Sequence, residues 1–148
     1  MRLDVAVLVR APRWKERLKP HVKTVRAACE AALVGFKGGK GVAISVVLAD
    51  DDFIRELNKT YRGKNKPTNV LSFYNSEAPL GDMVLAYETV AREAKAQKKT
   101  FKAHAIHLMV HGCLHLMGYD HECENEAEEM EAMEIKILKK LGVRNPYL

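Results

Sequence analysis

The sequence predicts an α+β fold, in which a small mixed β-sheet packs against about five helices and a candidate metal site lies on a central helix and the loop after it. Two observations indicate this class. Valine-rich extended segments alternate with helical segments in the first half of the chain, whereas the second half is mostly helical. The 148 residues also contain no repeat, low-complexity segment or linker, and this length allows one sizeable core. We therefore expect a single domain over residues 1–148.

The first half of the chain is predicted to contain two strands and two helices. Residues 3–9 alternate in polarity and are rich in valine, which is typical of a strand. Apolar residues then recur at helical spacing over residues 22–36, and the glycine cluster at 38–41 ends this helix. Residues 42–49 are apolar and β-branched, which predicts a strand buried on both faces. The aspartates at 50–52 can cap a short helix that follows.

The second half is predicted to contain a short sheet segment followed by three helices. A polar, basic loop at residues 62–69 comes first. The later segments are an extended piece at 70–73, a loop at 75–80, a strand at 82–86 and helices at 88–98, 100–117 and 124–140. Thr100 can cap the middle helix, and Gly118 ends it because glycine tolerates a left-handed backbone.

The cysteines and the apolar segments indicate a protein of the cytoplasm. Cys29, Cys113 and Cys123 are odd in number and widely spaced, which predicts reduced thiols, the first two of them in the core. The longest apolar run near the N-terminus, residues 5–9, is too short for a signal peptide or a bilayer span. We therefore expect a cytoplasmic location and no membrane partner.

The net charge of +5 hides an asymmetry along the chain. Residues 1–121 hold 20 basic and 12 acidic side chains, a net charge of +8, whereas residues 122–134 carry seven acidic side chains and no basic one. A basic body suits a polyanionic partner such as nucleic acid. Many soluble proteins are equally basic without such a partner, so this prediction depends on the site residues.

The segment HGCLHLMGYDHE at residues 111–122 carries the strongest chemical signal in the sequence. His111 and His115 are four residues apart, which on a helix places them one turn apart on the same face. Because Gly118 ends the helix, His121 can approach the same point from a loop. Three neutral imidazoles at tetrahedral positions suit zinc and leave a fourth position open, which is the pattern of a catalytic site.

Neighbouring polar residues could complete or orient this site. Cys123 stays open as a fourth ligand, whereas Cys113 points to the opposite side of the helix. His104 and His107 lie on the same predicted helix face as His111 and His115, and the four residues form a histidine stripe. His104 and His107 either make ordinary hydrogen bonds or contact a ligand histidine or the substrate. Asp120 could orient a ligand histidine or cap the last helix.

The spacing H-x-x-x-H-x-x-G-x-x-H also matches the metzincin proteases. Those enzymes have a glutamate directly after the first histidine, where it acts as the general base. This chain has Gly112 at that position. A peptidase would lack its proton shuttle, so the spacing favours a metal and argues against a protease.

The segment HGCLHLMGYDH resembles the signature of the YbeY family, bacterial metal-dependent endoribonucleases involved in ribosomal RNA maturation. LNKTYRGKNKPTNVLSF at residues 57–73 resembles the family's second block. Gly81 and Asp82, the run EAEEME and the final PYL are also similar to the family pattern. The similarity covers most of the chain beyond about residue 40.

The resemblance implies both a site and a reaction. His111, His115 and His121 would hold one Zn²⁺ ion per chain. Arg62 would be the catalytic basic residue that faces the metal cleft, where its paired N–H donors could stabilise a phosphodiester transition state. The lysines of the RGKNK loop either hold flanking phosphates or belong to a solvated loop.

Four aromatic residues lie near these elements. Tyr61 continues a helical apolar spacing and Phe73 an apolar strand, so both are predicted to pack in the core. The alternative is that these two, or Tyr74 and Tyr119, stack on unpaired bases.

The implied function is single-strand-specific cleavage of RNA in ribosomal RNA processing, at the 3′ end of small-subunit rRNA, and in ribosome quality control. The expected partners are ribosomal RNA and the ribosome or ribosomal proteins. Two alternatives stay open. One is a zinc hydrolase of another substrate class, such as a metzincin-like peptidase, and the other is a non-catalytic ribosome assembly factor with structural zinc.

Overall fold

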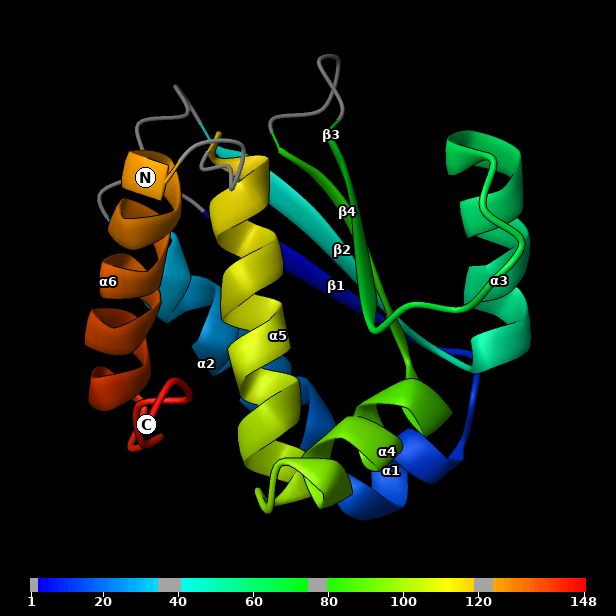
Figure 1. Ribbon diagram of the computed structural model, residues 1–148, viewed down its shortest axis with the longest axis horizontal. Helices are drawn as coiled ribbons and strands as arrows, with labels where there is room; N and C mark the ends of the chain where they lie inside the picture. The colour runs from blue at the N-terminus through cyan, green and yellow to red at the C-terminus, as the bar shows by residue number, and fades with distance from the viewer. Residues whose placement is uncertain (1–2, 35–40, 75–79, 119–123) are drawn as a thin grey trace.

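A mixed β-sheet lies at the centre of the computed structural model, which describes residues 3–34, 41–74, 80–118 and 124–148 (Figure 1). Within these residues the chain forms four strands and six helices. The predicted α+β class, with a small mixed sheet, is therefore confirmed, and the described residues contain one helix beyond the five expected.

The sheet has the strand order β1-β2-β4-β3. Its strands are β1 (Leu3–Val9), β2 (Val42–Ala49), β3 (Val70–Tyr74) and β4 (Gly81–Ala86). β1, β2 and β4 are parallel, whereas β3 runs antiparallel to β4 at the edge of the sheet. Gly81 pairs with Tyr74 in this last pair, and a Cβ atom at Gly81 would overlap the carbonyl oxygen of Phe73. Only glycine permits this close approach.

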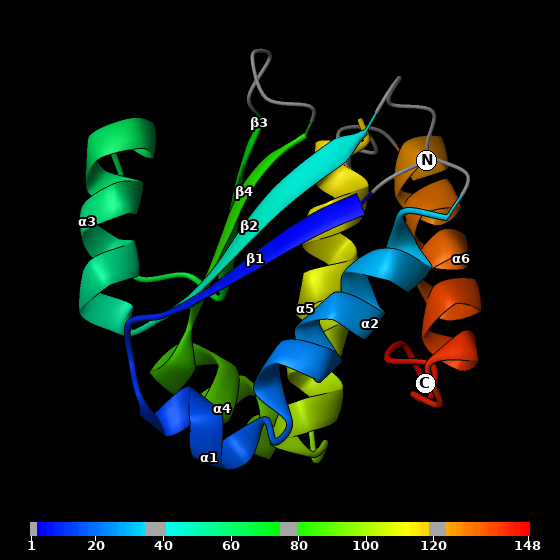
Figure 2. The ribbon, with the colours of Figure 1, turned by 180° about the vertical axis from the view of Figure 1, so that it is seen from behind.

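Helices cover both faces of the sheet. They are α1 (Arg13–Arg17), α2 (His21–Ala32), α3 (Asp51–Arg62), α4 (Tyr87–Ala96), α5 (Phe101–Leu116) and α6 (Glu124–Lys140). α2 and α5 pack on one face with α6 outside them, while α3 covers the other face beside β4 (Figures 1 and 2). α1 and α4 lie together at one end of the sheet. None of the helices in the described part of the chain is long and apolar enough to cross a membrane.

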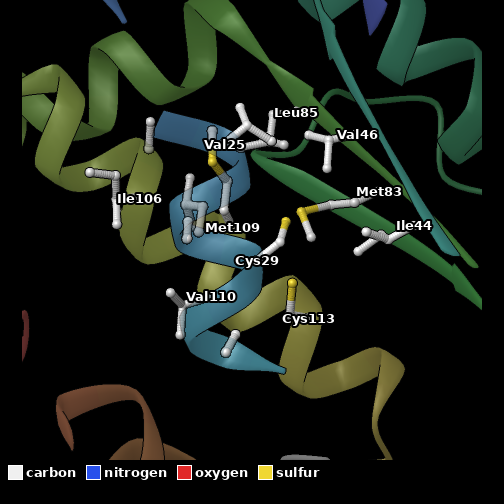
Figure 3. Packing of buried hydrophobic residues seen from close by; sticks show 14 of the residues in the cluster. Val25, Cys29, Ile44, Val46, Met83, Leu85, Ile106, Met109, Val110 and Cys113 are labelled. Carbon is white, nitrogen blue, oxygen red and sulfur yellow. The ribbon is translucent and has the colours of Figure 1, made fainter. Parts of the chain in front are cut away.

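Two apolar clusters hold these layers together. The larger one fills the space between the sheet and α2, α5 and α6, and it includes Val46, Met83 and Met109 (Figure 3). The smaller one lies under α3 and includes Ile54 and Leu71. Because each large side chain contributes about 1.5–3 kcal/mol when it is fully buried, the larger cluster supplies most of the driving force for folding.

Cys29 and Cys113 are free thiols buried in the larger cluster, as predicted (Figure 3). A hydrogen bond with Cys29, together with burial, raises the pKa of the Cys113 thiol well above its usual value. This thiol therefore stays protonated, and both cysteines serve as small core residues. Cys123 lies outside the described residues.

Helix α1 is absent from the sequence-based expectation. Its one large apolar residue, Trp14, is fully buried and donates its Nε1–H to the carbonyl oxygen of Ala49 at 2.8 Å. The Trp14 ring also packs edge-on against Tyr87, with the ring centroids 5.8 Å apart. A helix of five residues with one such anchor has no repeating apolar pattern, so periodicity cannot reveal it.

Two predicted elements differ from the structure in detail. Helix α2 ends at Ala32, and the predicted end at residue 36 lies outside the described residues. The expectation that β2 is buried on both faces is only half correct, because alternate residues of this strand are fully and partly buried. The physical reason is that α3 lies beside β4 and leaves the same face of β2 partly covered.

Candidate metal centre

Helix α5 carries the histidine stripe through the interior of the protein. It contacts α2, α4, α6 and the sheet, and 11 of its 16 residues are buried. A helix that is apolar all round belongs in the core, which explains its central place. Thr100 caps its N-terminus by accepting a hydrogen bond from the backbone N–H of Ala103 at 3.1 Å. Gly118, with φ of 102°, follows its last turn, and both end signals are confirmed.

His111 and His115 lie one turn apart near the C-terminal end of α5. Their ring centroids are 4.5 Å apart and their Nε2 atoms are 3.0 Å apart. Two nitrogens that bind one tetrahedral zinc ion at about 2.0–2.1 Å would be about 3.3–3.4 Å apart. The two imidazoles therefore fit a shared metal ion to within a few tenths of an ångström.

A buried carboxylate from α6 lies beside this pair. Glu134 has a side-chain exposure of 0%, and its Oε1 is 2.9 Å from Nδ1 of His111 and 3.0 Å from Nε2 of His107. Its Oε2 accepts a hydrogen bond from the Tyr147 hydroxyl at 2.7 Å. Burial by itself would raise the pKa of Glu134, but the hydrogen bonds from His107, His111 and Tyr147 outweigh it and lower the pKa to about 2. Glu134 is therefore an ionised carboxylate inside the protein.

His104, the first histidine of the stripe, belongs to a separate network. Its Nε2 lies 2.8 Å from Oε1 of Glu93 on α4, and Nδ2 of Asn69 donates to the same oxygen at 3.0 Å. Burial lowers the pKa of His104 against the opposing effect of Glu93. The sequence leaves two interpretations open for these histidines. His104 makes an ordinary hydrogen bond, with Glu93, whereas His107 is linked to the predicted ligand His111 through the carboxylate of Glu134.

Arg62 shares one cleft with the histidine pair. The cleft has a volume of about 490 Å³, and both His111 and His115 line it together with Arg62. Its other walls come mainly from polar side chains of β3 and the residue before it, Asn69, Ser72 and Tyr74. Among the described residues, no acidic side chain lines the cleft. An anionic group would therefore meet Arg62 and no carboxylate among the lining residues that the structure describes.

The basic loop that follows Arg62 is held against α3. Gly63 ends that helix with a left-handed φ of 68°. Asn58, a buried residue of α3, donates its Nδ2–H to the carbonyl oxygen of Lys66 at 2.8 Å. Its own carbonyl accepts a hydrogen bond from the backbone N–H of Lys64 at 3.2 Å. The two lysine side chains are exposed, so the loop presents two cations next to the arginine.

The third predicted zinc ligand, His121, lies outside the described residues, as do Tyr119, Asp120 and Cys123. In the part of the chain that the structure describes, no three His, Cys, Asp or Glu side chains are arranged to hold a metal ion. The complete ligand set therefore stays a prediction.

The aromatic residues near the cleft differ from the expectation in one case. Tyr61 is 68% exposed, so the prediction that it packs in the core is wrong. It lies in the last turn of α3, where its ring rests on Phe73 at a centroid distance of 5.5 Å instead of entering the interior. Phe73 is partly buried and packs against the smaller cluster, as predicted. Tyr74 is 70% exposed and lines the cleft.

Gly112, the position of the metzincin glutamate, faces the sheet. A Cβ atom there would lie 2.9 Å from both Sδ and Cε of Met83 and 3.1 Å from Oγ of Ser72. The Ser72 hydroxyl also donates to the carbonyl oxygen of Gly112 at 3.3 Å. A side chain at residue 112 would therefore require the flexible end of Met83 to move, and a glutamate there would bring a charge into a buried part of α5.

Glu134 contacts His111 but is not predicted from the sequence, where it is one of the seven acidic residues of the segment 122–134. A signal nevertheless exists. Glu134 lies four residues after the buried Met130 and four before the buried Leu138, so it stands within the apolar stripe of α6. A carboxylate at such a position indicates a buried partner, since an unpaired buried charge is very costly.

The fold and the cleft together define an α+β protein in which two histidines of one helix and an arginine line the same cleft. The chain belongs to the endoribonuclease YbeY family, whose model matches residues 12–142. This assignment agrees with the resemblance that the histidine segment and the RGKNK block suggest.

Curated relatives cover nearly the whole chain. A protein from Rhodopseudomonas palustris named endoribonuclease YbeY is 47% identical over 150 residues, which span 95% of this chain and 79% of that protein. A protein of the same name from Azorhizobium caulinodans is also 47% identical, over 98% of this chain and 96% of its own. A solution structure of a Thermotoga maritima protein matches with a TM-score of 0.58 over 93% of this chain and 91% of that one. At 23% identity, this last match supports the fold alone.

Replacing Gly112 with glutamate, the residue of the peptidase motif, should destabilise the fold and create no peptidase. The side chain would displace the flexible end of Met83 and bury a carboxylate, and the buried charge accounts for most of a cost of about 3 kcal/mol or more. Urea unfolding followed by circular dichroism measures this loss. Lys102→Glu, at an exposed position of the same helix, is the control and should change stability by less than about 0.5 kcal/mol. A Gly112→Glu variant as stable as wild type would contradict the packing argument.

Proposed function

We propose that the protein is a zinc-dependent endoribonuclease that cleaves single-stranded RNA. The observation that carries this proposal is the shared cleft, in which the Nε2 atoms of His111 and His115 lie 3.0 Å apart and Arg62 lines the same space. The absence of acidic side chains among the described lining residues suits a phosphodiester substrate. Membership of the endoribonuclease YbeY family supports RNA as that substrate.

His111 and His115, with His121 as the third predicted ligand, would hold the zinc ion. A bound zinc ion would lower the pKa of a water molecule to about 7, which would supply a nucleophile at neutral pH. It would also polarise a phosphoryl oxygen of the substrate. Arg62 contributes the complementary part of the chemistry. Its guanidinium offers paired N–H donors to the negative charge that develops on the phosphate, and this charge is greater in the transition state than in the ground state.

The surroundings of the cleft favour an unpaired RNA strand. Tyr74 on the cleft wall and Tyr61 beside it are both largely exposed, so each can stack on a base that is not already paired. Lys64 and Lys66 are held by Asn58 next to Arg62, where they can contact flanking phosphates. A stiff duplex brings its phosphates to a recessed metal less easily than a splayed strand does.

The family and the charge support a proposal for the biological role. We infer that the RNA is ribosomal, with maturation of the 3′ end of small-subunit rRNA and ribosome quality control as the processes, and that the ribosome or ribosomal proteins are partners in the cytoplasm. The family assignment and the net charge of +8 over residues 1–121 support this role.

Metal analysis combined with RNA cleavage tests the proposal. Purified protein should contain about one zinc ion per chain and cleave a structured RNA in its unpaired regions. His115→Ala should lose both metal and activity, whereas the control His104→Ala, which lies in the separate network with Glu93, should keep the metal.

Two results would replace the proposal with another function. Cleavage of casein but not of RNA would indicate a peptidase. A protein that unfolds when zinc is removed, and regains no nuclease activity when zinc returns, would indicate an assembly factor with structural zinc.

Arg62→Glu should reduce kcat for RNA cleavage by about 10²–10³-fold or more while zinc content and stability stay unchanged, because Arg62 acts on phosphate charge. Lys59→Glu, an equal charge reversal at an exposed position in the last turn of α3, is the matched control and should keep most of the activity. If Arg62→Glu cleaves RNA at the wild-type rate, the catalytic role of Arg62 is wrong.

Neutralising Lys64 and Lys66 together should weaken the salt dependence of RNA binding. Each lost phosphate contact lowers the slope of log affinity against log salt by about one unit, so the double variant should lose about one to two units. Lys139→Gln combined with Lys140→Gln, two exposed lysines at the far end of α6, is the matched control and should leave the slope unchanged. An unchanged slope in the first double variant would mean that the basic loop is only solvated and that RNA binds elsewhere.

A further inference from the structure

We infer that Glu134 is a positioning residue for the metal, because its carboxylate holds His111 in the tautomer that binds through Nε2. This inference rests on the proposed metal site and adds to it a residue from α6. It also concerns the imidazole itself, so it can be tested on protein without any metal.

The contact with Glu134 determines which ring nitrogen of His111 carries the proton. Oε1 of Glu134 lies 2.9 Å from Nδ1 of His111 and 3.0 Å from Nε2 of His107, and a carboxylate oxygen held between two ring nitrogens accepts a hydrogen bond from each. Nδ1 must therefore carry the proton, and in the neutral ring the lone pair is then on Nε2. That nitrogen is the one that lies 3.0 Å from Nε2 of His115. With the proton on Nε2 instead, His111 would present a donor to the metal and could not bind it.

The position of the carboxylate is fixed from several sides. Oε1 also faces Nε2 of His107 at 3.0 Å, and Oε2 accepts from the Tyr147 hydroxyl at 2.7 Å. Nδ1 of His107 is buried and has no partner among the described residues, so the proton of that ring is on Nε2 and His107 acts as a donor. With no solvent exposure of the Glu134 side chain, water does not compete for these hydrogen bonds.

The His104–Glu93 pair, whose histidine lies on the same helix, differs from the His111–Glu134 pair. His104 and Glu93 also form a histidine–carboxylate contact, at 2.8 Å, but Glu93 is 32% exposed and bonds Asn69 instead of a second histidine. An apolar side chain would serve the packing of α6 between Met130 and Leu138, since a buried carboxylate is costly to desolvate. The three donors that converge on Glu134 therefore point to a role in orienting His111.

The tautomer of His111 is the direct test. In metal-free protein at about pH 8, where imidazoles are mostly neutral, long-range ¹H–¹⁵N spectra distinguish Nδ1–H from Nε2–H rings. His111 should be an Nδ1–H ring in wild type, and His111→Gln assigns its signals. Glu134→Leu should convert His111 wholly or partly to the Nε2–H form. Finding wild-type His111 as an Nε2–H ring would overturn the inference, whether or not any variant folds.

Metal affinity is the second readout, measured by competition for zinc with a chromophoric chelator. Glu134→Leu should weaken zinc binding by about 10–100-fold, the usual effect of removing a partner of a ligand histidine. Glu134→Gln should lose less, because its amide oxygen can still accept from Nδ1. Glu93→Leu is the matched control and should keep the wild-type affinity. The absorption spectrum of bound Co²⁺ should change in Glu134→Leu and not in Glu93→Leu, and near-UV circular dichroism checks that each variant is folded.

The outcomes separate this inference from the proposed function. A wild-type protein that takes up no zinc contradicts the metal site. If wild type binds zinc and a folded Glu134→Leu variant binds it equally well, the metal site stands and the role of Glu134 is wrong. Equal losses in Glu134→Leu and Glu93→Leu would also overturn the inference, because they would indicate a general effect on α5.

Discussion

The burial of helix α5 is the constraint on which the rest of the structure depends. This helix packs against the sheet, α2, α4 and α6, so each buried polar side chain on it must find a partner inside the protein. Its four histidines meet this requirement in two ways. His104 bonds the carboxylate of Glu93, and His107 and His111 bond that of Glu134, while His111 and His115 also line the cleft. The position of one helix thus determines both the core and the chemistry.

Much of the site could be predicted from the sequence, because its signals are local. The four-residue spacing of His111 and His115 is a property of one helix, and Thr100 and Gly118 mark where that helix begins and ends. Most of the strands and helices followed from periodicity in the same way. The position of Arg62 on the cleft could not be predicted from periodicity. Arg62 is the last residue of α3, and no pattern within that helix indicates that the histidines of α5 lie near it. That expectation came from the family resemblance, and the cleft brings these residues together.

The features that the sequence did not reveal depend on contacts between distant segments. Glu134 is 23 residues from His111, and their contact is visible only when α6 packs against α5. Tyr61 follows the apolar spacing of α3 but lies in its last turn, where its ring rests on Phe73 and stays 68% exposed. Helix α1 is fixed by Trp14 together with Arg13 and Arg17, whose partners are 35 or more residues away. In each case the contacts that fix the position of the residue form only in the tertiary structure.

The antiparallel pairing of β3 and β4 has a geometric consequence for the cleft. Arg62 and the histidines come from helices on opposite faces of the sheet, and residues of the edge strand β3 stand between them. A shift of β3 by one residue would move its side chains by about 3.4 Å and exchange their faces, so Ser72 and Tyr74 would leave the cleft wall. The contact of Gly81 with the backbone of β3 fits one alignment closely. Gly81, which has no side chain and does not line the cleft, thus favours the strand alignment that places Ser72 and Tyr74 between Arg62 and the histidines.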